Sequence, residues 1–138
     1  MLWVLDTDHV SLFQRRNPLV VQNVQRTRPN ELAITVVTYE EQLRGWLNYI
    51  RRASDQAQLI VGYQKLKESL NFFCDKQVLE FTEAVATEYS YLQQQKLRIG
   101  TQDLRIAAIV LSVDGVIVTR NRRDFGQVPG LQIEDWSL

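Results

Sequence analysis

Residues 2–8 read Leu-Trp-Val-Leu-Asp-Thr-Asp, a short apolar run that stops at two acids. A continuous apolar run of this length is typical of a strand buried on both faces, and Asp and Thr are favoured where a helix begins. The sequence therefore predicts a buried strand and then a helix from about Asp8 to Arg16. Asn17-Pro18 opens a second helix, with proline in its first turn.

The rest of the chain repeats this alternation of apolar runs and helical patterns. Strands are predicted at 32–36, 78–81, 116–119 and, more weakly, 131–133. Helices are predicted at about 38–53, 56–73 and 102–113, with another that begins at Thr82. Strands that are apolar throughout and alternate with helices form a parallel sheet covered on both faces. We expect an α/β fold with a mostly parallel sheet of four to five strands.

Length and composition fit one ordinary globular domain. The chain has 138 residues, of which 45% are hydrophobic and 23% charged, a composition that disfavours disorder and low-complexity repeats. Cys74 is the only cysteine and is expected to be inert packing. No apolar run approaches the ~20 residues that cross a bilayer, and no signal sequence is evident. We therefore expect a cytoplasmic protein that does not contact a membrane.

The charge balance leaves a nucleic-acid partner open. Lys and Arg number 16 and Asp and Glu number 16, so the net charge is zero. Arginine nevertheless supplies 12 of the 16 cations, and its planar fork suits phosphate.

Acidic residues follow the predicted strands. Asp6 ends the first strand, Glu40-Glu41 lies in the first turn after the second, and Asp124 follows the strand at 116–119. Asp103 lies in the first turn of the helix that precedes that strand. The carboxyl ends of parallel strands meet at one edge of a sheet, where ligands bind in such folds. We expect these acids to converge there, although any single Asp after a strand is more often a helix cap.

Converging carboxylates repel one another and need protons or a cation. With one histidine and one cysteine in the chain, the available ligands are oxygens, which favour Mg²⁺ or Mn²⁺ over Zn²⁺. Such ions bind phosphate oxygens and activate water, so hydrolysis of a phosphodiester is the natural chemistry.

The spacing of neighbouring residues distinguishes Glu40 from Glu41. Arg44 lies four residues after Glu40, where it can form a surface ion pair. Gly45 lies four residues after Glu41 and leaves that carboxylate open to a cation. Glu41 is therefore the candidate ligand.

Other polar and aromatic residues near these acids have ordinary explanations. Thr119 and Asn121 are expected to orient the acids through hydrogen bonds, and Arg122 and Arg123 to bind the backbone of a nucleic acid. His9 is expected to be a solvated or capping residue rather than a general base. The tryptophans are expected to pack in the core rather than stack on bases.

Four stretches together resemble the motifs of a known family: residues 5–8 (LDTD), 38–45 (TYEEQLRG), 100–108 (GTQDLRIAA) and 119–125 (TRNRRDF). They are similar, in this order and at these separations, to the motifs of PIN-domain ribonucleases, and more narrowly of VapC-type toxins of toxin–antitoxin pairs. The similarity runs from residue 2 to Glu134-Asp135-Trp136, which implies a single PIN-like domain over residues 1–138 with three α/β/α layers.

The resemblance implies a metal-dependent endoribonuclease with Asp6, Glu41, Asp103 and Asp124 as the acidic quartet that binds Mg²⁺ or Mn²⁺. Asp8 stands where many relatives have Asn; we place it beside the quartet, and the number of metal ions stays open. The implied partners are RNA, a small VapB-like antitoxin and a second copy of the chain within a larger complex. We expect an antitoxin helix in a groove lined by apolar residues of the first four helices: Leu12, Phe13, Val20, Val24, Leu47 and Tyr63.

Two other functions compete with this interpretation. Residues 6–10 (DTDHV) fit the Asp-x-Asp-x-Val motif of haloacid-dehalogenase-type phosphohydrolases, with Asp6 as nucleophile and Asp8 as acid/base. That family needs an acidic motif directly after a later buried strand, whereas polar residues 93–96 precede Asp103. A PIN-like binding module without catalysis is disfavoured because all four acids are present.

Overall fold

The fold is built on a parallel sheet of five strands in the order β3-β2-β1-β4-β5. A computed structural model describes all residues, 1–138. The strands are β1 (Trp3–Leu5), β2 (Leu32–Thr35), β3 (Val78–Leu79), β4 (Val116–Val118) and β5 (Gln132–Glu134). The predicted α/β class is confirmed, with all five strands parallel and the weak last strand present.

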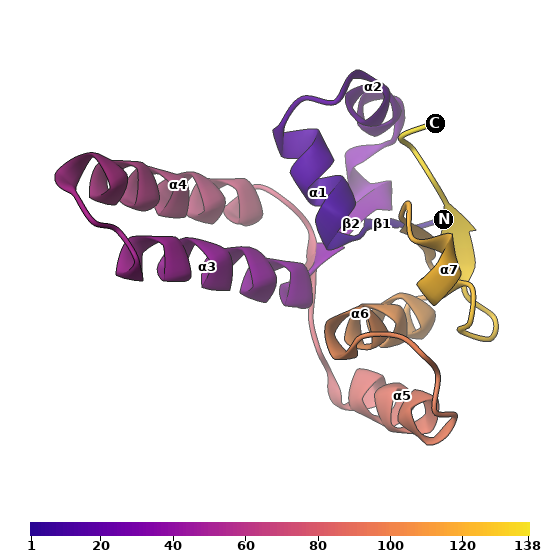
Figure 1. Ribbon diagram of the computed structural model, residues 1–138. Coiled ribbons are helices and arrows are strands. Elements are labelled where there is room, and N and C mark those ends of the chain that lie inside the picture. The colour runs from indigo at the N-terminus through magenta and orange to yellow at the C-terminus, as the bar shows by residue number, and fades with distance from the viewer.

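Helices cover both faces of the sheet (Figure 1). The helices are α1 (Thr7–Gln14), α2 (Pro18–Arg26), α3 (Val36–Arg51), α4 (Gln56–Cys74), α5 (Glu83–Gln94), α6 (Thr101–Ser112) and the short α7 (Arg122–Phe125). Helices α1 and α2 lie on one side of the sheet and α5 and α6 on the other, while α3 and α4 form a hairpin that extends away from it (Figure 1). A 3₁₀ turn, Pro29–Glu31, precedes β2. None of the helices combines the length and the apolar character that a membrane span requires.

Successive residues of the central strands point into two separate cores, as the alternation of a pleated strand requires. Val4, Ala33 and Ile117 belong to the core under α5 and α6. Leu5, Ile34 and Val118 belong to the core under α1 and α2, which the chain end completes. Helix α6 is the most deeply buried helix: Leu104 and all of residues 106–110 are buried. The sheet is therefore fixed from both sides.

The helix starts differ slightly from those predicted. Thr35, rather than Thr38, caps α3: its hydroxyl accepts a hydrogen bond from the Thr38 amide at 3.1 Å. The helix therefore begins directly where β2 ends. Similarly, Asp6 caps α1, which begins at Thr7 and ends at Gln14.

The strand register brings the ends of the central strands to one level. Leu5 of β1 pairs with Val118 of β4, so Asp6 and Thr119 each come one residue beyond a paired strand end. The Asp6 amide donates to the Val118 carbonyl at 3.0 Å, which keeps the two ends together. The predicted acidic edge is built around this point.

Candidate active site

Asp6 is the most tightly held acid of the site. Its Oδ1 accepts the His9 amide at 2.7 Å, as the cap of α1, and its Oδ2 accepts the Thr119 hydroxyl at 2.6 Å. The residue is only 5% exposed, and Thr119 is fully buried. Each carboxylate oxygen keeps a further lone pair, so Asp6 can still bind a cation in the pocket.

The two adjacent glutamates of α3 have different surroundings. Glu41 Oε1 accepts the Thr7 hydroxyl at 2.6 Å, beside Asp6. Glu40 forms an ion pair with Arg44 instead, at 2.7 Å, and accepts a hydrogen bond from the side-chain Nε2 of Gln102 at 2.8 Å. A Cβ atom added at Gly45 would meet nothing within 4 Å. The predicted ion pair of Glu40 is thus confirmed, and the space beside Glu41 is open.

Asp103 shows that the four acids converge. The pKa of its carboxyl is raised from 3.8 to about 6, first by burial and then by the charges of Asp6, Glu41 and Asp124. These acids come from positions far apart in the sequence: Asp6 directly follows β1, Asp103 lies in the first turn of α6 and Asp124 lies in α7. Glu41 lies in the second turn of α3 rather than in the first as predicted, because α3 begins at Val36. Their mutual repulsion is the electrostatic signature of a site that attracts cations.

Asn121 holds the fourth acid, Asp124. Its side-chain oxygen accepts a hydrogen bond from the Asp124 backbone amide at 3.2 Å, and its side-chain Nδ2 donates to Asp124 Oδ2 at 3.0 Å. The backbone amide of Asn121 in turn donates to the Thr119 hydroxyl at 2.9 Å. A chain of hydrogen bonds therefore runs from Asp6 through Thr119 and Asn121 to Asp124.

Asp8 faces an arginine that sequence reasoning did not single out. Arg120 Nε donates to Asp8 Oδ2 at 2.7 Å, and its Nη2 donates to Oδ1 at 2.9 Å. This pair lies at a polar pocket of about 440 Å³ lined by Asp6, Thr7, Asp8, Ser11, Asp103, Arg120 and Asn121. The only sequence signal for Arg120 was its place between the strand end and Asn121.

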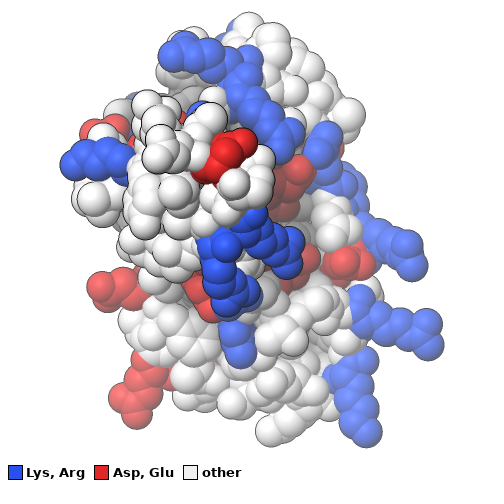
Figure 2. Space-filling view, turned by 60° about the vertical axis from the view of Figure 1, so that its left-hand side comes forward, with Lys and Arg blue, Asp and Glu red and all other residues white.

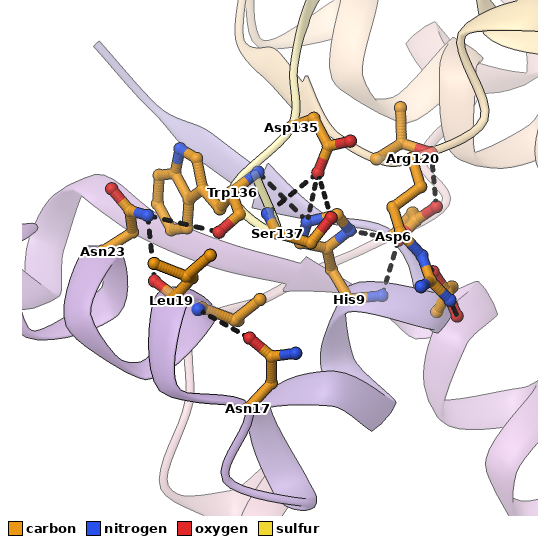
Figure 3. A network of polar contacts seen from close by, with 12 residues as sticks. Asp6, His9, Asn17, Leu19, Asn23, Arg120, Asp135, Trp136 and Ser137 are labelled. Carbon is orange, nitrogen blue, oxygen red and sulfur yellow. Dashed lines mark hydrogen bonds and ion pairs between the residues drawn. The ribbon is translucent and has the colours of Figure 1, made fainter.

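His9 is not the solvated or capping residue that we expected. It is fully buried, and its Nε2 accepts the Trp136 amide at 3.2 Å. Its Nδ1 has no hydrogen-bond partner and lies 3.4 Å from Asp6 Oδ1. Figure 3 shows the imidazole between Asp6 and the last residues of the chain. The reason is that the chain end folds back over α1 after β5, which no local pattern indicates.

The chain end is fixed by several polar contacts around His9 (Figure 3). Asn23 of α2 donates to the Trp136 carbonyl at 3.3 Å. Asp135 accepts both the amide and the hydroxyl of Ser137. Partial burial opposes ionisation of Asp135, but these two bonds and nearby His9 and Arg122 outweigh it and lower its pKa. The carboxyl terminus is thus part of the site's support.

The other residues that the sequence analysis singled out differ in their exposure to solvent. Arg122 and Arg123 are exposed and form no ion pair. Trp136 is buried, but Trp3 and Trp46 are only partly so, and Cys74 is exposed, contrary to our expectation of inert packing. Figure 2 shows a face on which basic side chains stand around recessed acidic ones.

Two sets of side chains offer ligands for a cation. Asp6, Asp8 and His9 have ligand atoms within 4.8 Å of one another. In that set, however, Arg120 donates to both oxygens of Asp8, and the one unpartnered nitrogen of His9, Nδ1, is fully buried behind Asp6. The other set is the all-oxygen quartet of Asp6, Glu41, Asp103 and Asp124, whose repulsion a divalent cation would relieve. The quartet is the better fit to Mg²⁺ or Mn²⁺.

The chain is similar along its whole length to curated proteins. It is 28% identical to Ribonuclease VapC1 of Haemophilus influenzae (strain R2866), with 99% of both chains covered. It is 25% identical to the tRNA(fMet)-specific endonuclease VapC of Salmonella typhimurium, with 97% of both covered. No protein-family model matches the chain.

Solved structures share its fold. The structure of VapBC-1 from nontypeable Haemophilus influenzae contains a chain with a TM-score of 0.79 and 26% identity, and each chain is covered completely. DNA-bound VapBC from Salmonella typhimurium gives a TM-score of 0.78 at 24% identity over 99% of both chains, a likeness of fold. Sequence and fold thus agree: from end to end, the chain is similar to VapC-type ribonucleases.

Proposed function

We propose that the protein is the toxin of a toxin–antitoxin pair and cleaves RNA by metal-dependent hydrolysis of phosphodiester bonds, with Asp6, Glu41, Asp103 and Asp124 as the metal-binding acids. The carrying observation is the convergence of these acids from β1, α3, α6 and α7: Asp6 and Asp103 line one polar pocket, and Glu41 and Asp124 lie close enough to raise the pKa of Asp103. The printed names of the relatives, a ribonuclease and a tRNA(fMet)-specific endonuclease, support the reaction class.

The acids fit a hard divalent cation. All four offer carboxylate oxygens, the ligands that Mg²⁺ and Mn²⁺ prefer. A bound ion of this kind supplies Lewis-acid chemistry for the attack of water on a phosphodiester. The haloacid-dehalogenase alternative has no support, since Asp8 is held by Arg120.

The chain's own residues hold the acids in place. Thr119 fixes one oxygen of Asp6, Thr7 fixes Glu41, and Asn121 fixes Asp124. Each hydrogen bond limits the rotation of a carboxylate, so the ligands stay oriented when no cation is bound. Arg122 and Arg123 are exposed at the start of α7 and are proposed to contact the RNA backbone.

The proposed protein partner is a VapB-like antitoxin that occupies a groove between α1, α2, α3 and α4. This groove has a volume of about 970 Å³, and its lining includes Phe13, Val24, Trp46 and Phe72. Of the six apolar residues predicted for it, only Phe13 and Val24 line it; Val20 is fully buried in the core. The solved VapBC complexes support a partner of this type.

A second copy of the chain is also proposed as a partner. Apolar side chains of the α3–α4 hairpin are exposed, among them Leu47 at 49%, Ile60 at 58% and Tyr63 at 59%. Covering them in a homodimer would remove apolar surface from water. Sedimentation equilibrium measures this directly, and a dimer is expected.

The function is tested by incubating the purified chain with tRNA and other structured RNAs in Mg²⁺, Mn²⁺ or excess chelator. We expect discrete cleavage with either ion and none with chelator. Expression of the chain alone should arrest growth, and co-expression of an adjacent antitoxin reading frame should relieve the arrest. Harmless expression of the active enzyme would contradict the toxin role but leave the nuclease assignment intact.

A further inference from the structure

Arg120 is the one cationic side chain of the polar pocket. Of the residues that line it, Asp6, Asp8 and Asp103 are acids, and Arg120 is the only base. An RNA strand carries a phosphate at every nucleotide, so it is repelled by such a pocket unless cations offset the carboxylates. Arg120 is placed to do this at the pocket wall.

The contact with Asp8 uses one edge of the guanidinium. Asp8 accepts hydrogen bonds from Nε and Nη2, and the Arg120 side chain forms no other hydrogen bond within the chain. The adjacent edge, formed by Nη1 and the second N–H of Nη2, is therefore free to donate. The side chain is 52% exposed, so an incoming strand can reach it. Two parallel N–H donors match the oxygens of a phosphate.

The arrangement also explains the role of Asp8. A free arginine side chain loses much rotamer freedom when it binds a ligand. The two-point contact with Asp8 fixes its orientation beforehand and raises the pKa of the guanidinium, first through the side-chain hydrogen bond. Asp8 is itself 46% exposed and has both oxygens engaged, which is the arrangement of a positioning residue.

We propose that Arg120 binds a phosphate of the RNA strand through its free guanidinium edge, and that Asp8 positions Arg120 and is not a metal ligand. This inference rests on the proposed ribonuclease function and assigns its substrate contact to Arg120 in addition to Arg122 and Arg123. A cluster of acids alone would not indicate a phosphate contact. The indication is the guanidinium of Arg120, which Asp8 orients and which keeps N–H donors without a partner.

The test is RNA affinity, measured by fluorescence anisotropy with a labelled single-stranded oligonucleotide and Ca²⁺ in place of Mg²⁺. Arg120→Gln should weaken binding about tenfold and reduce the salt slope of log K by about 0.7. The matched control is Arg44→Gln, because Arg44 forms a similar exposed pair with Glu40 but does not line the pocket. This variant should bind as the wild type does. Unchanged affinity and salt slope in Arg120→Gln would overturn the proposal; if this variant fails to fold, Arg120→Lys, which lacks the fork, replaces it.

Asp8 is tested by a double-mutant cycle. Asp8→Asn should weaken RNA binding less than Arg120→Gln does, and the double variant should bind no more weakly than Arg120→Gln alone, because Asp8 acts through Arg120. The affinity for Mn²⁺ alone, measured by calorimetry, should change less than about twofold in Asp8→Asn. A loss of tenfold or more would identify Asp8 as a metal ligand and contradict the proposal. Wild-type cleavage in Mg²⁺ tests the ribonuclease function separately from both results.

Discussion

His9 Nε2 accepts a hydrogen bond from the Trp136 amide at 3.2 Å, across 127 positions of sequence. The contact joins the first helix to the end of the chain. Trp136 also packs against Trp3, with 5.9 Å between ring centroids. Since His9 follows Asp6 in the first turn of α1, the chain end supports the strand end that carries the first acid.

Replacing His9 by Leu should destabilise the fold. The substitution puts an apolar side chain of similar size in place of the imidazole and leaves the buried Trp136 amide without an acceptor, which costs about 1–3 kcal/mol. Urea unfolding followed by tryptophan fluorescence measures this. Leu138→Ala is the control, because Leu138 is 86% exposed and its truncation should cost less than about 0.5 kcal/mol. Equal stability of His9→Leu and the wild type would refute the structural role of this contact.

Glu40 and Glu41 form a matched pair for testing the acidic site. Glu41→Gln should remove most RNA cleavage, because Glu41 is one of the proposed metal-binding acids. Its carboxylate accepts the Thr7 hydroxyl, and its charge raises the pKa of Asp103. Glu40→Gln should be nearly silent, because Glu40 contacts Arg44 and Gln102. Cleavage rates at saturating Mg²⁺, with circular dichroism to confirm folding, decide the matter. Comparable losses in both variants would show that the assignment of Glu41 is incorrect.

Asp103→Asn should stabilise the metal-free protein at neutral pH. The folded-state pKa of Asp103 is raised from 3.8 to about 6, so the folded state binds the proton more tightly than the unfolded state. This contribution to stability is complete below about pH 4 and is lost as the pH rises through 6. A shift of this size is roughly 3 kcal/mol without screening, and solvent around the half-buried carboxyl reduces it to about 1 kcal/mol.

The measurement is the free energy of unfolding in excess chelator at pH 5 and pH 7.5. The advantage of Asp103→Asn over the wild type should appear at the higher pH and shrink at the lower one. The variant should nevertheless cleave no RNA. If Asp103→Asn were less stable than the wild type at pH 7.5, the acids would not repel one another as the account requires.

Much of this architecture follows from local sequence. Apolar runs such as residues 2–5 and 116–118 identify the central strands, and the acids after them identify the edge at which Asp6, Glu41, Asp103 and Asp124 converge. The predicted cap of α3 is three residues too late because Thr35 and Thr38 are both good caps. Only the tertiary position of Thr35 at the end of β2 distinguishes them.

The long-range contacts could not be predicted from sequence. His9 looks like a polar residue at a helix start, and its burial depends on a chain end that returns over α1. Arg120 was one of several arginines near Asp124, and only the fold places it opposite Asp8. Thr7 lies between two acids in the sequence, yet its contact with Glu41 requires that α1 and α3 lie side by side.

The groove assignment predicts a separation of antitoxin binding from catalysis. Phe13→Asp or Val24→Asp places a charge in the groove and should weaken antitoxin binding at least tenfold, because an apolar contact becomes a buried charge. RNA cleavage by the free chain should persist. Leu47→Asp is the control, since Leu47 is exposed outside the groove and this variant should bind normally. Binding is measured by co-purification and calorimetry, and undiminished binding by both groove variants would place the antitoxin elsewhere.

The most direct test of the central claim, metal-dependent hydrolysis by the acidic quartet, is the chemistry of the RNA ends. By analogy with PIN-domain ribonucleases, attack by water should leave a 5′-phosphate and a 3′-hydroxyl, which ligation and phosphatase treatment identify on the purified fragments. We predict these ends with Mg²⁺ or Mn²⁺, and no fragments with excess chelator or from Asp6→Asn. Cleavage that continues in chelator and leaves a 2′,3′-cyclic phosphate would show attack by the ribose hydroxyl without a metal and would contradict the account.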